Sequence, residues 1–325
     1  MDKRIRGYLI HMKATAAIIA TLALTPAGLL LAAPAQAAGG PTVSTGNPQA
    51  VSYSSAVLTG SVNPNGRETS YYFQYGLTRA YGGQSAIAGA GAGTDTVHVA
   101  LPITGLQPIT RYHYRLVAVS TAGVSEGPDR TLLTGKIPLS LQILASPNPV
   151  AFGGAVTVQG TLSGTEDANR EVVLQADSFP FTAGFQDAAN PELTNASGGF
   201  SFPVLGLTVI TQFRVVTNTN PPVISPVAAE NVAVSVSSHV GRSRRPGFVR
   251  IYGTVTPGED GMQVAILRIV HGHGVLVGGT LLRPDGANRS AFSAAVHATA
   301  GVYRVLVRVT GGGQVSSYGQ PLRIG

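Results

Sequence analysis

Apolar and polar residues alternate along most of the chain after residue 40, with the two-residue period of strands that bury one face. The period places Tyr71, Phe73 and Tyr75 on one face of a predicted strand over residues 69–75. A longer predicted strand over residues 106–118 also carries apolar residues at every second position. No segment after residue 37 has the 3.6-residue period of an amphipathic helix. The pattern therefore predicts that residues 38–325 fold almost entirely as β-strands.

Turn and strand motifs in residues 41–135 match one known family. The matching segments are Val62-Asn63-Pro64-Asn65-Gly66, residues 72–76, Leu106-x-Pro108-x-Thr110-x-Tyr112-x-Tyr114 and residues 118–123. They resemble the fibronectin type III domains of exported bacterial proteins. The resemblance implies a seven-stranded sandwich without catalytic residues, in which Tyr112 is the corner tyrosine that hydrogen-bonds the backbone. The family's early core tryptophan is absent, and we expect Tyr71 or Phe73 in its place.

The rest of the chain shows an internal repeat between residues 137–235 and 236–325. Val156-x-Val158-x-Gly160-x-Leu162 corresponds to Val249-x-Ile251-x-Gly253-x-Val255, and Phe213-Arg214-Val215 corresponds to Tyr303-Arg304-Val305. Each copy has strand patterns separated by glycine and proline turns, which is typical of small β-sandwiches. By this layout both copies resemble bacterial immunoglobulin-like domains.

These patterns together predict an all-β fold of three tandem immunoglobulin-like β-sandwiches after an N-terminal signal peptide. The predicted parts are the signal peptide at residues 1–37, a fibronectin type III-like domain at 38–136, an immunoglobulin-like domain at 137–235 and a basic immunoglobulin-like domain at 236–325. We expect short linkers near residues 135–138 and 235–247, and an end-to-end arrangement with limited bending.

The first 37 residues have the three-part layout of a secretory signal. A basic region with Lys3, Arg4, Arg6 and Lys13 precedes an apolar run over residues 14–33, and Ala35-Gln36-Ala37 supplies the small residues that a signal peptidase reads. We predict that the protein is secreted or held at the cell surface. Two alternatives stay open, namely retention of the segment as a membrane anchor and a true start at Met12 rather than Met1.

Two amino acids are missing altogether, because the chain has no cysteine and no tryptophan. An exported chain without cysteine holds no disulfides, so its stability comes from packed cores. It also has no thiolate nucleophile and no cysteine metal site. Aromatic residues make up 6% of the chain, which disfavours a broad sugar-stacking platform.

Positive charge is concentrated in residues 236–325, where ten arginines stand against three acidic residues, a net charge of +7. The densest cluster is Arg242, Arg244, Arg245 and Arg250, which we predict to be a basic binding patch. Outside a cell it would meet an anionic cell-wall polymer, a membrane surface or another envelope protein. Nucleic acid is a poor candidate, because an export signal precedes the cluster and few aromatic residues interleave it. The alternative interpretation is a linker that the arginines keep soluble.

His271-Gly272-His273 is the strongest metal candidate, because it puts two imidazoles on one side of a strand or across a turn. A zinc site needs further ligands, and none is evident nearby, so an exposed hairpin turn is the competing interpretation. No cofactor is predicted.

The search for catalytic motifs leads to a non-catalytic prediction. No Gly-x-Ser-x-Gly nucleophile elbow occurs, and three sandwiches fill residues 38–325 without leaving a catalytic domain. We predict an extracytoplasmic adhesion, spacer or envelope-associated binding protein, not an enzyme. The alternatives are an accessory or carbohydrate-active component of a secreted enzyme, and a metal-carrying surface protein.

Overall fold

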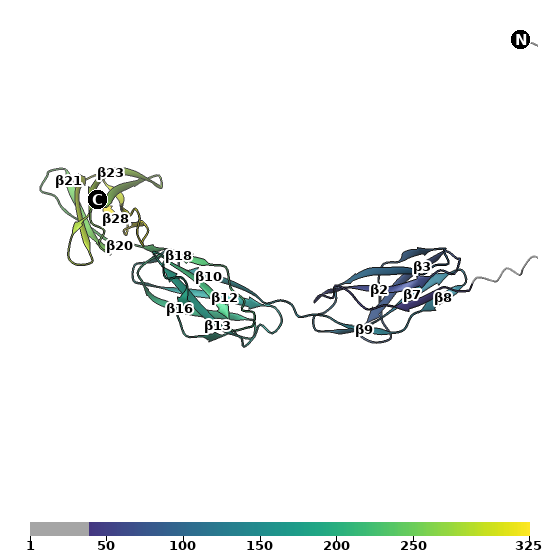
Figure 1. Ribbon diagram of the computed structural model, residues 1–325. Coiled ribbons are helices and arrows are strands. Elements are labelled where there is room, and N and C mark those ends of the chain that lie inside the picture. Colours follow the sequence, from purple (N-terminus) through teal and green to yellow (C-terminus); the bar gives the residue numbers. More distant parts are fainter. Residues whose placement is uncertain (1–38) are drawn as a thin grey trace, which may run out of the picture.

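The computed structural model describes residues 39–325, and every regular element in that part of the chain is a β-strand (Figure 1). The strands form three two-layered sandwiches that follow one another along the chain, each with its own buried core. The all-β prediction is therefore confirmed. The predicted signal peptide lies outside the described residues.

In the first sandwich, nine strands pack as one sheet of three and one sheet of six around a core centred on Phe73, Tyr114 and Leu116. This division into two antiparallel sheets is that of fibronectin type III and immunoglobulin domains. A short run of alanine and glycine at residues 88–91 forms a strand that pairs with β3. The strands are β1 (Thr42–Thr45), β2 (Ser55–Asn63) and β6 (Val97–Thr104) in one sheet, and β4 (Gly83–Gln84), β3 (Thr69–Gly76), β7 (Arg111–Ser120), β8 (Gly123–Glu126), β5 (Ala88–Gly91) and β9 (Arg130–Leu133) in the other.

The second sandwich repeats this arrangement around Phe202, Phe213 and Leu174, all of which are fully buried. A short parallel pair closes one end of it. The strands are β10 (Ser140–Ser146), β12 (Gly154–Ser163) and β16 (Gly199–Leu207) in one sheet; β14 (Gln186–Asp187), β13 (Glu171–Ser178), β17 (Thr211–Thr217), β18 (Ala228–Glu230) and β15 (Glu192–Leu193) in the other; and β11 (Val150–Ala151) with β19 (Val232–Ala233) in the pair.

The third sandwich packs around Ile251, Ile266 and Tyr303. Its strands are β20 (Ser235–Arg242), β21 (Phe248–Thr256), β25 (Ser290–His297) and β24 (Arg283–Pro284) in one sheet, and β23 (His273–Leu281), β22 (Gln263–Val270), β26 (Gly301–Arg308), β27 (Ser317–Tyr318) and β28 (Leu322–Ile324) in the other.

The predicted linker at residues 235–247 is wrong. Residues 235–242 form β20, which pairs with β21 from Ser235↔Thr256 to Arg242↔Val249, and the following residues form the β20–β21 turn. Val234 and Val236 hold the start of β20 on the core, whereas the serine, histidine and glycine residues that follow look like linker composition when read alone. The arginines of this segment therefore lie on a hairpin.

A glycine packed beneath a phenylalanine occurs at the same place in the second and third sandwiches. Gly160 of β12 pairs with Phe200 of β16, and Gly253 of β21 pairs with Phe292 of β25. In each case the aromatic ring occupies the space that a side chain on the glycine would need. The shared geometry accords with the internal repeat.

The junction between the second and third sandwiches is tied by backbone hydrogen bonds. Val315 in the loop before β27 accepts from Val234 and donates to Val232, and the Ile210 amide donates to Gly313, with N–O distances of 3.2, 2.8 and 2.6 Å. The connection between the first two sandwiches is longer, spanning residues 134–139, and within it Ile137 bonds to Thr165 through both its amide and its carbonyl. Extended backbone thus continues directly from one sandwich into the next.

The carboxyl group of Glu230 is fully buried at the end of the second sandwich. Its Oε1 accepts a 3.1 Å hydrogen bond from the Val150 amide, while its Oε2 has no partner. Burial raises the pKa of Glu230, and the bond from Val150 lowers it by less. Because the folded state has the higher pKa, it favours the neutral form of Glu230. Protonation of Glu230 therefore stabilises the folded state fully below the ordinary pKa of about 4.3, and this contribution to the free energy of unfolding is lost as pH rises through the folded-state pKa.

Glu230→Gln is therefore expected to stabilise the second sandwich by about 1 kcal/mol at neutral pH, because it removes an incompletely paired buried charge. At about pH 4 the gain should vanish. Hydrogen exchange of amides in β13 and β17 would measure both values. The exposed Glu192→Gln is the control, and a gain that is the same at both pH values would contradict the explanation.

Candidate functional site

The outer face of the β20–β21–β25 sheet is the best candidate site, because it gathers basic and aromatic side chains from three strands. Arg250 and Tyr252 point outward from β21, since Ile251 between them is buried in the core. The strand register places His239 of β20 and Ser293 of β25 on either side of Tyr252. The cross-strand neighbours His239, Tyr252 and Ser293 are thus far apart in the sequence.

Two stacks of rings and guanidinium groups organise this face. The Arg250 guanidinium lies 4.3 Å from the centre of the Tyr252 ring, and the His239 ring lies 5.7 Å from it. The second stack is at the β20–β21 turn and contains Arg245, Phe248 and His297. The Arg245 guanidinium is 4.0 Å from the Phe248 ring centre, and the His297 ring is 4.2 Å from it.

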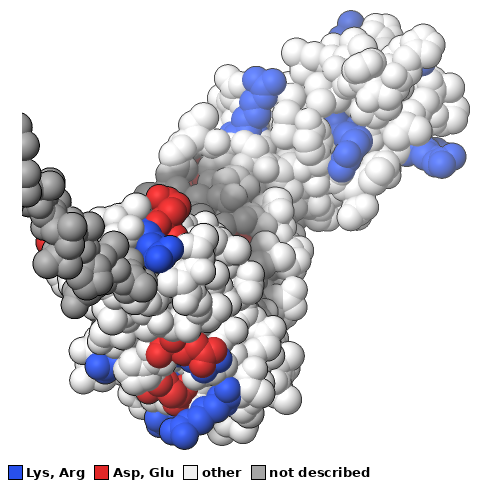
Figure 2. Space-filling model, turned by 90° about the vertical axis from the view of Figure 1, so that its right-hand side faces the viewer, with Lys and Arg blue, Asp and Glu red and all other residues white. Residues whose placement is uncertain are grey.

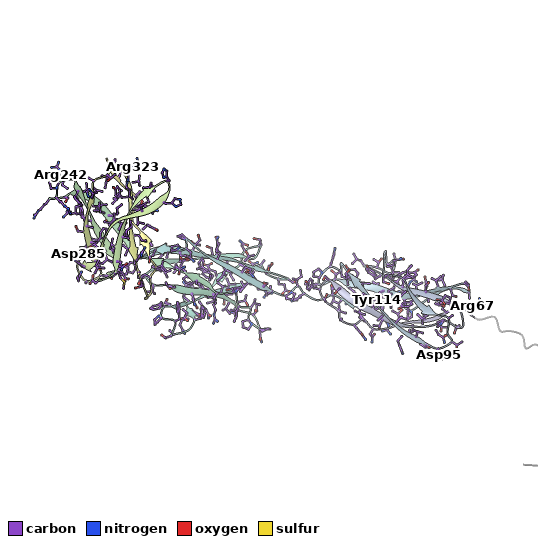
Figure 3. The ribbon with its side chains drawn as sticks, turned by 90° about the horizontal axis from the view of Figure 1, so that it is seen from above. Arg67, Asp95, Tyr114, Arg242, Asp285 and Arg323 are labelled. Atoms are coloured by element: carbon purple, nitrogen blue, oxygen red, sulfur yellow. The ribbon has the colours of Figure 1, made fainter. Side chains whose placement is uncertain are left out.

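The structure separates the four arginines of the predicted basic patch. Arg245 and Arg250 belong to the two stacks. Arg242 pairs with Val249, so its side chain projects from the face of the sheet opposite to that of Arg250. Arg244 lies in the turn. Figure 3 shows Arg242 at the outer end of the third sandwich, away from the second sandwich.

Charge on this sandwich is largely uncompensated. Within the described residues, none of the four arginines of the predicted patch forms an ion pair. The ion pair that the third sandwich does contain joins Arg289 to Asp285. Figure 2 shows arginine side chains and no acidic ones on the visible face of the upper lobe, which is the third sandwich. Among residues 39–325, no carboxylate therefore neutralises these four arginines.

The predicted metal pair sits at a hairpin tip. His271 and Gly272 both have positive φ, 49° and 82°, and connect β22 to β23, which His273 begins. Positive φ at both central residues is the geometry of a two-residue hairpin turn. Residues 39–325 contain no group of three histidine or acidic residues placed to hold a metal ion. A third protein ligand for His271 and His273 is thus not found in that part of the chain.

Sequence reasoning missed a polar cluster on the first sandwich around Asp129. Its carboxylate accepts hydrogen bonds from His113 Nδ1 at 2.9 Å, Tyr81 Oη at 3.0 Å and Arg79 Nε at 3.2 Å. Burial raises the pKa of Asp129, but the bonds from His113 and Tyr81 outweigh it and hold the pKa below its usual value. In residues 39–325 the His113 side chain bonds only Asp129, so the cluster ties the β3–β4 and β8–β9 loops to β7.

Tyr112 lies at the corner position that the resemblance implies. Its ring is buried, and its hydroxyl oxygen accepts a 3.0 Å hydrogen bond from the Gln107 amide five residues upstream. Its neighbour Tyr114 is fully buried and donates a 2.8 Å bond to the Gly46 carbonyl. Burial raises the pKa of Tyr114 to about 12. Both tyrosines act as structural residues that tie strands together.

Comparison with known proteins adds a likeness of architecture. The sequence matches no protein-family model and no curated protein. Among solved structures, the chicken CNTN1 FN1–FN3 domains match with 15% identity and a TM-score of 0.27 over 87% of this chain and 96% of that one. A tetra-tandem repeat from the extending region of a large adhesion protein matches with 15% identity and a TM-score of 0.31 over 89% and 74%. Such values carry no argument about function.

A search of residues 39–325 for membrane-spanning helices finds no helix with the required length and apolar character.

Proposed function

We propose that this chain is an exported, non-catalytic protein of the cell envelope, in which the sandwiches act as spacers and the third sandwich binds an anionic wall polymer. Its role would be adhesion or attachment to an envelope layer. The observation that carries the proposal is the group of arginines on the β20–β21 hairpin that form no ion pair with any residue from 39 to 325, in a sandwich with a net charge of +7.

The arrangement of the three sandwiches supports the spacer part of the proposal. Their cores are separate, and short extended connections join consecutive sandwiches, with the third set at an angle to the line of the first two (Figure 1). A basic patch at the far end of the third sandwich is well placed to reach a polymer away from the first sandwich. Electrostatic attraction to a polyanion needs no covalent chemistry and no cofactor.

Removing three arginines of the patch should weaken binding to wall polymer about tenfold, because each contact with a polyanion releases counterions. The variant is Arg242→Ala with Arg244→Ala and Arg245→Ala. Sedimentation with purified cell-wall fraction would measure the bound protein at about 0.05 M and about 1 M salt, where screening differs strongly. Binding by the unmodified protein should be lost at the higher salt.

The matched control removes the same charge elsewhere on the same sandwich, as Arg283→Ala with Arg308→Ala and Arg323→Ala. It should bind almost as well as the unmodified protein. Absent or salt-independent binding would overturn the proposal. Binding confined to phosphatidylglycerol vesicles would replace the wall polymer by a membrane surface.

A further inference from the structure

A shallow hollow of about 260 Å³ lies on the outer face of the third sandwich, directly over Tyr252. Three strands line it, so it is built into the sheet and does not depend on a loop. Pockets for drug-sized ligands take about 300–1,000 Å³, and a hollow of this size admits a single sugar unit. The polar lining residues are Ser237 and His239 of β20, Arg250, Tyr252 and Thr254 of β21, and Ser293 of β25.

Hydroxyl groups around the hollow are available to a ligand. In the described part of the chain, the hydroxyls of Tyr252, Thr254 and Ser293 make no hydrogen bond, whereas the Ser237 hydroxyl lies 3.2 Å from His239 Nε2. Thr254 and Ser293 come from neighbouring strands and flank the hollow. Hydroxyls both donate and accept, so this lining suits a ligand that is itself rich in hydroxyls.

The charged member of the lining is held in place before any ligand arrives. The Arg250 guanidinium lies over the Tyr252 ring, 4.3 Å from its centre, and has no carboxylate partner in the described residues. A stacked guanidinium keeps its N–H edges free, and a planar fork of donors matches the two oxygens of a carboxylate. The lining of the hollow contains no acidic residue.

We infer that this hollow is a subsite for one acidic sugar of an extended polysaccharide, with its carboxylate bound by Arg250 and its hydroxyls by Thr254 and Ser293. The inference rests on the proposed function and specifies its ligand.

Other polyanions fit the hollow less well. A polyphosphate would accept hydrogen bonds from Arg250 and from the hydroxyls of Thr254 and Ser293, but it offers no donor in return, so the acceptor capacity of these hydroxyls would stay unused. Arg250 and His239 already lie against the Tyr252 ring, which leaves little room for a nucleobase to stack. A flat bilayer surface would not enter a hollow of about 260 Å³, so it would leave the hydroxyls of Thr254 and Ser293 without a partner.

The test uses calorimetric titration of the protein with a galacturonic-acid oligosaccharide. Arg250→Lys keeps the charge but removes the bidentate fork, and it should weaken binding about tenfold. Arg308→Lys, on the other sheet, is the matched control and should leave binding unchanged. Thr254→Val with Ser293→Ala should weaken binding of the oligosaccharide about tenfold and weaken polyphosphate binding less, because phosphate oxygens only accept from these hydroxyls.

Three outcomes would overturn the acidic-sugar inference while leaving the proposed function intact. They are equal binding by the Arg250→Lys and Arg308→Lys variants, equal affinity for a neutral galactose oligosaccharide, and tighter binding of polyphosphate with no effect of the hydroxyl variants. Failure of the unmodified protein to bind wall polymer and every other polyanion would instead overturn the proposed function itself.

Discussion

Phe73→Ala should unfold the first sandwich selectively, with a loss of about 3–5 kcal/mol in its free energy of unfolding. Phe73 is fully buried at the centre of the core and lies opposite Leu116 across the β3–β7 pair. The chain has no tryptophan, so Phe73 is one of the large aromatic side chains that fill this core. Deleting the ring therefore leaves a cavity that the rigid sheets on both sides cannot close.

Hydrogen exchange across the whole chain is the measurement for Phe73→Ala, because one unfolding curve would merge three sandwiches. Protection should fall in β3 and β7 and stay unchanged in the two later sandwiches, whose cores are separate. Tyr72→Ala on the opposite face of the strand is the control and should cost much less. An equal loss of protection in all three sandwiches would show that they unfold as one unit.

Gly253→Ala should destabilise the third sandwich by about 3 kcal/mol, because no space exists for a methyl group at this position. A Cβ on Gly253 would lie 1.9 Å from the Ser237 carbonyl oxygen and 2.9 Å from Phe292 Cζ. To relieve the clash, β20 would have to move away from β21. That movement would also disturb the hollow over Tyr252, so binding and stability should fall together.

The same substitution at the repeated position should act alike in the second sandwich. A Cβ on Gly160 would lie 2.3 Å from the Gln142 carbonyl oxygen and 2.5 Å from Phe200 Cζ. Gly89→Ala is the control, because nothing lies within 4 Å of its Cβ position. Thermal unfolding and local hydrogen exchange would compare the three variants. Tolerance of alanine at Gly253 or Gly160 would contradict the close packing between these strands.

Much of the fold could be predicted because most strands have a local sequence signal, the alternation of apolar and polar residues. The alternation at Tyr71, Phe73 and Tyr75 identified a strand and its buried face, and both are found in β3. The segment at residues 235–247 was misinterpreted, since glycine, serine and arginine residues diluted the valine period of β20. Composition averaged over a short window is a weaker signal than the period within it.

The candidate site could be predicted only in part. The arginines near residue 245 stand out in the sequence, and their charge alone indicated an anionic partner. The closeness of these arginines in the sequence did not predict that Arg242 and Arg250 project from opposite faces of the sheet. The Asp129 cluster on the first sandwich gave no local signal either, because His113, Tyr81 and Asp129 come from separate segments.

The division between the two kinds of knowledge follows from the range of the interactions. Strand periodicity and turn residues are local signals, and net charge is a sum over the sequence. The strands, the turns and the basic character of the last sandwich can therefore be predicted from the sequence alone. Cross-strand neighbours depend on register and on loop length, and a shift of one residue would turn every side chain to the other face. Only the folded sheet brings Ser293 within reach of Tyr252, stacks Arg250 on that ring and leaves the hydroxyls of the hollow free.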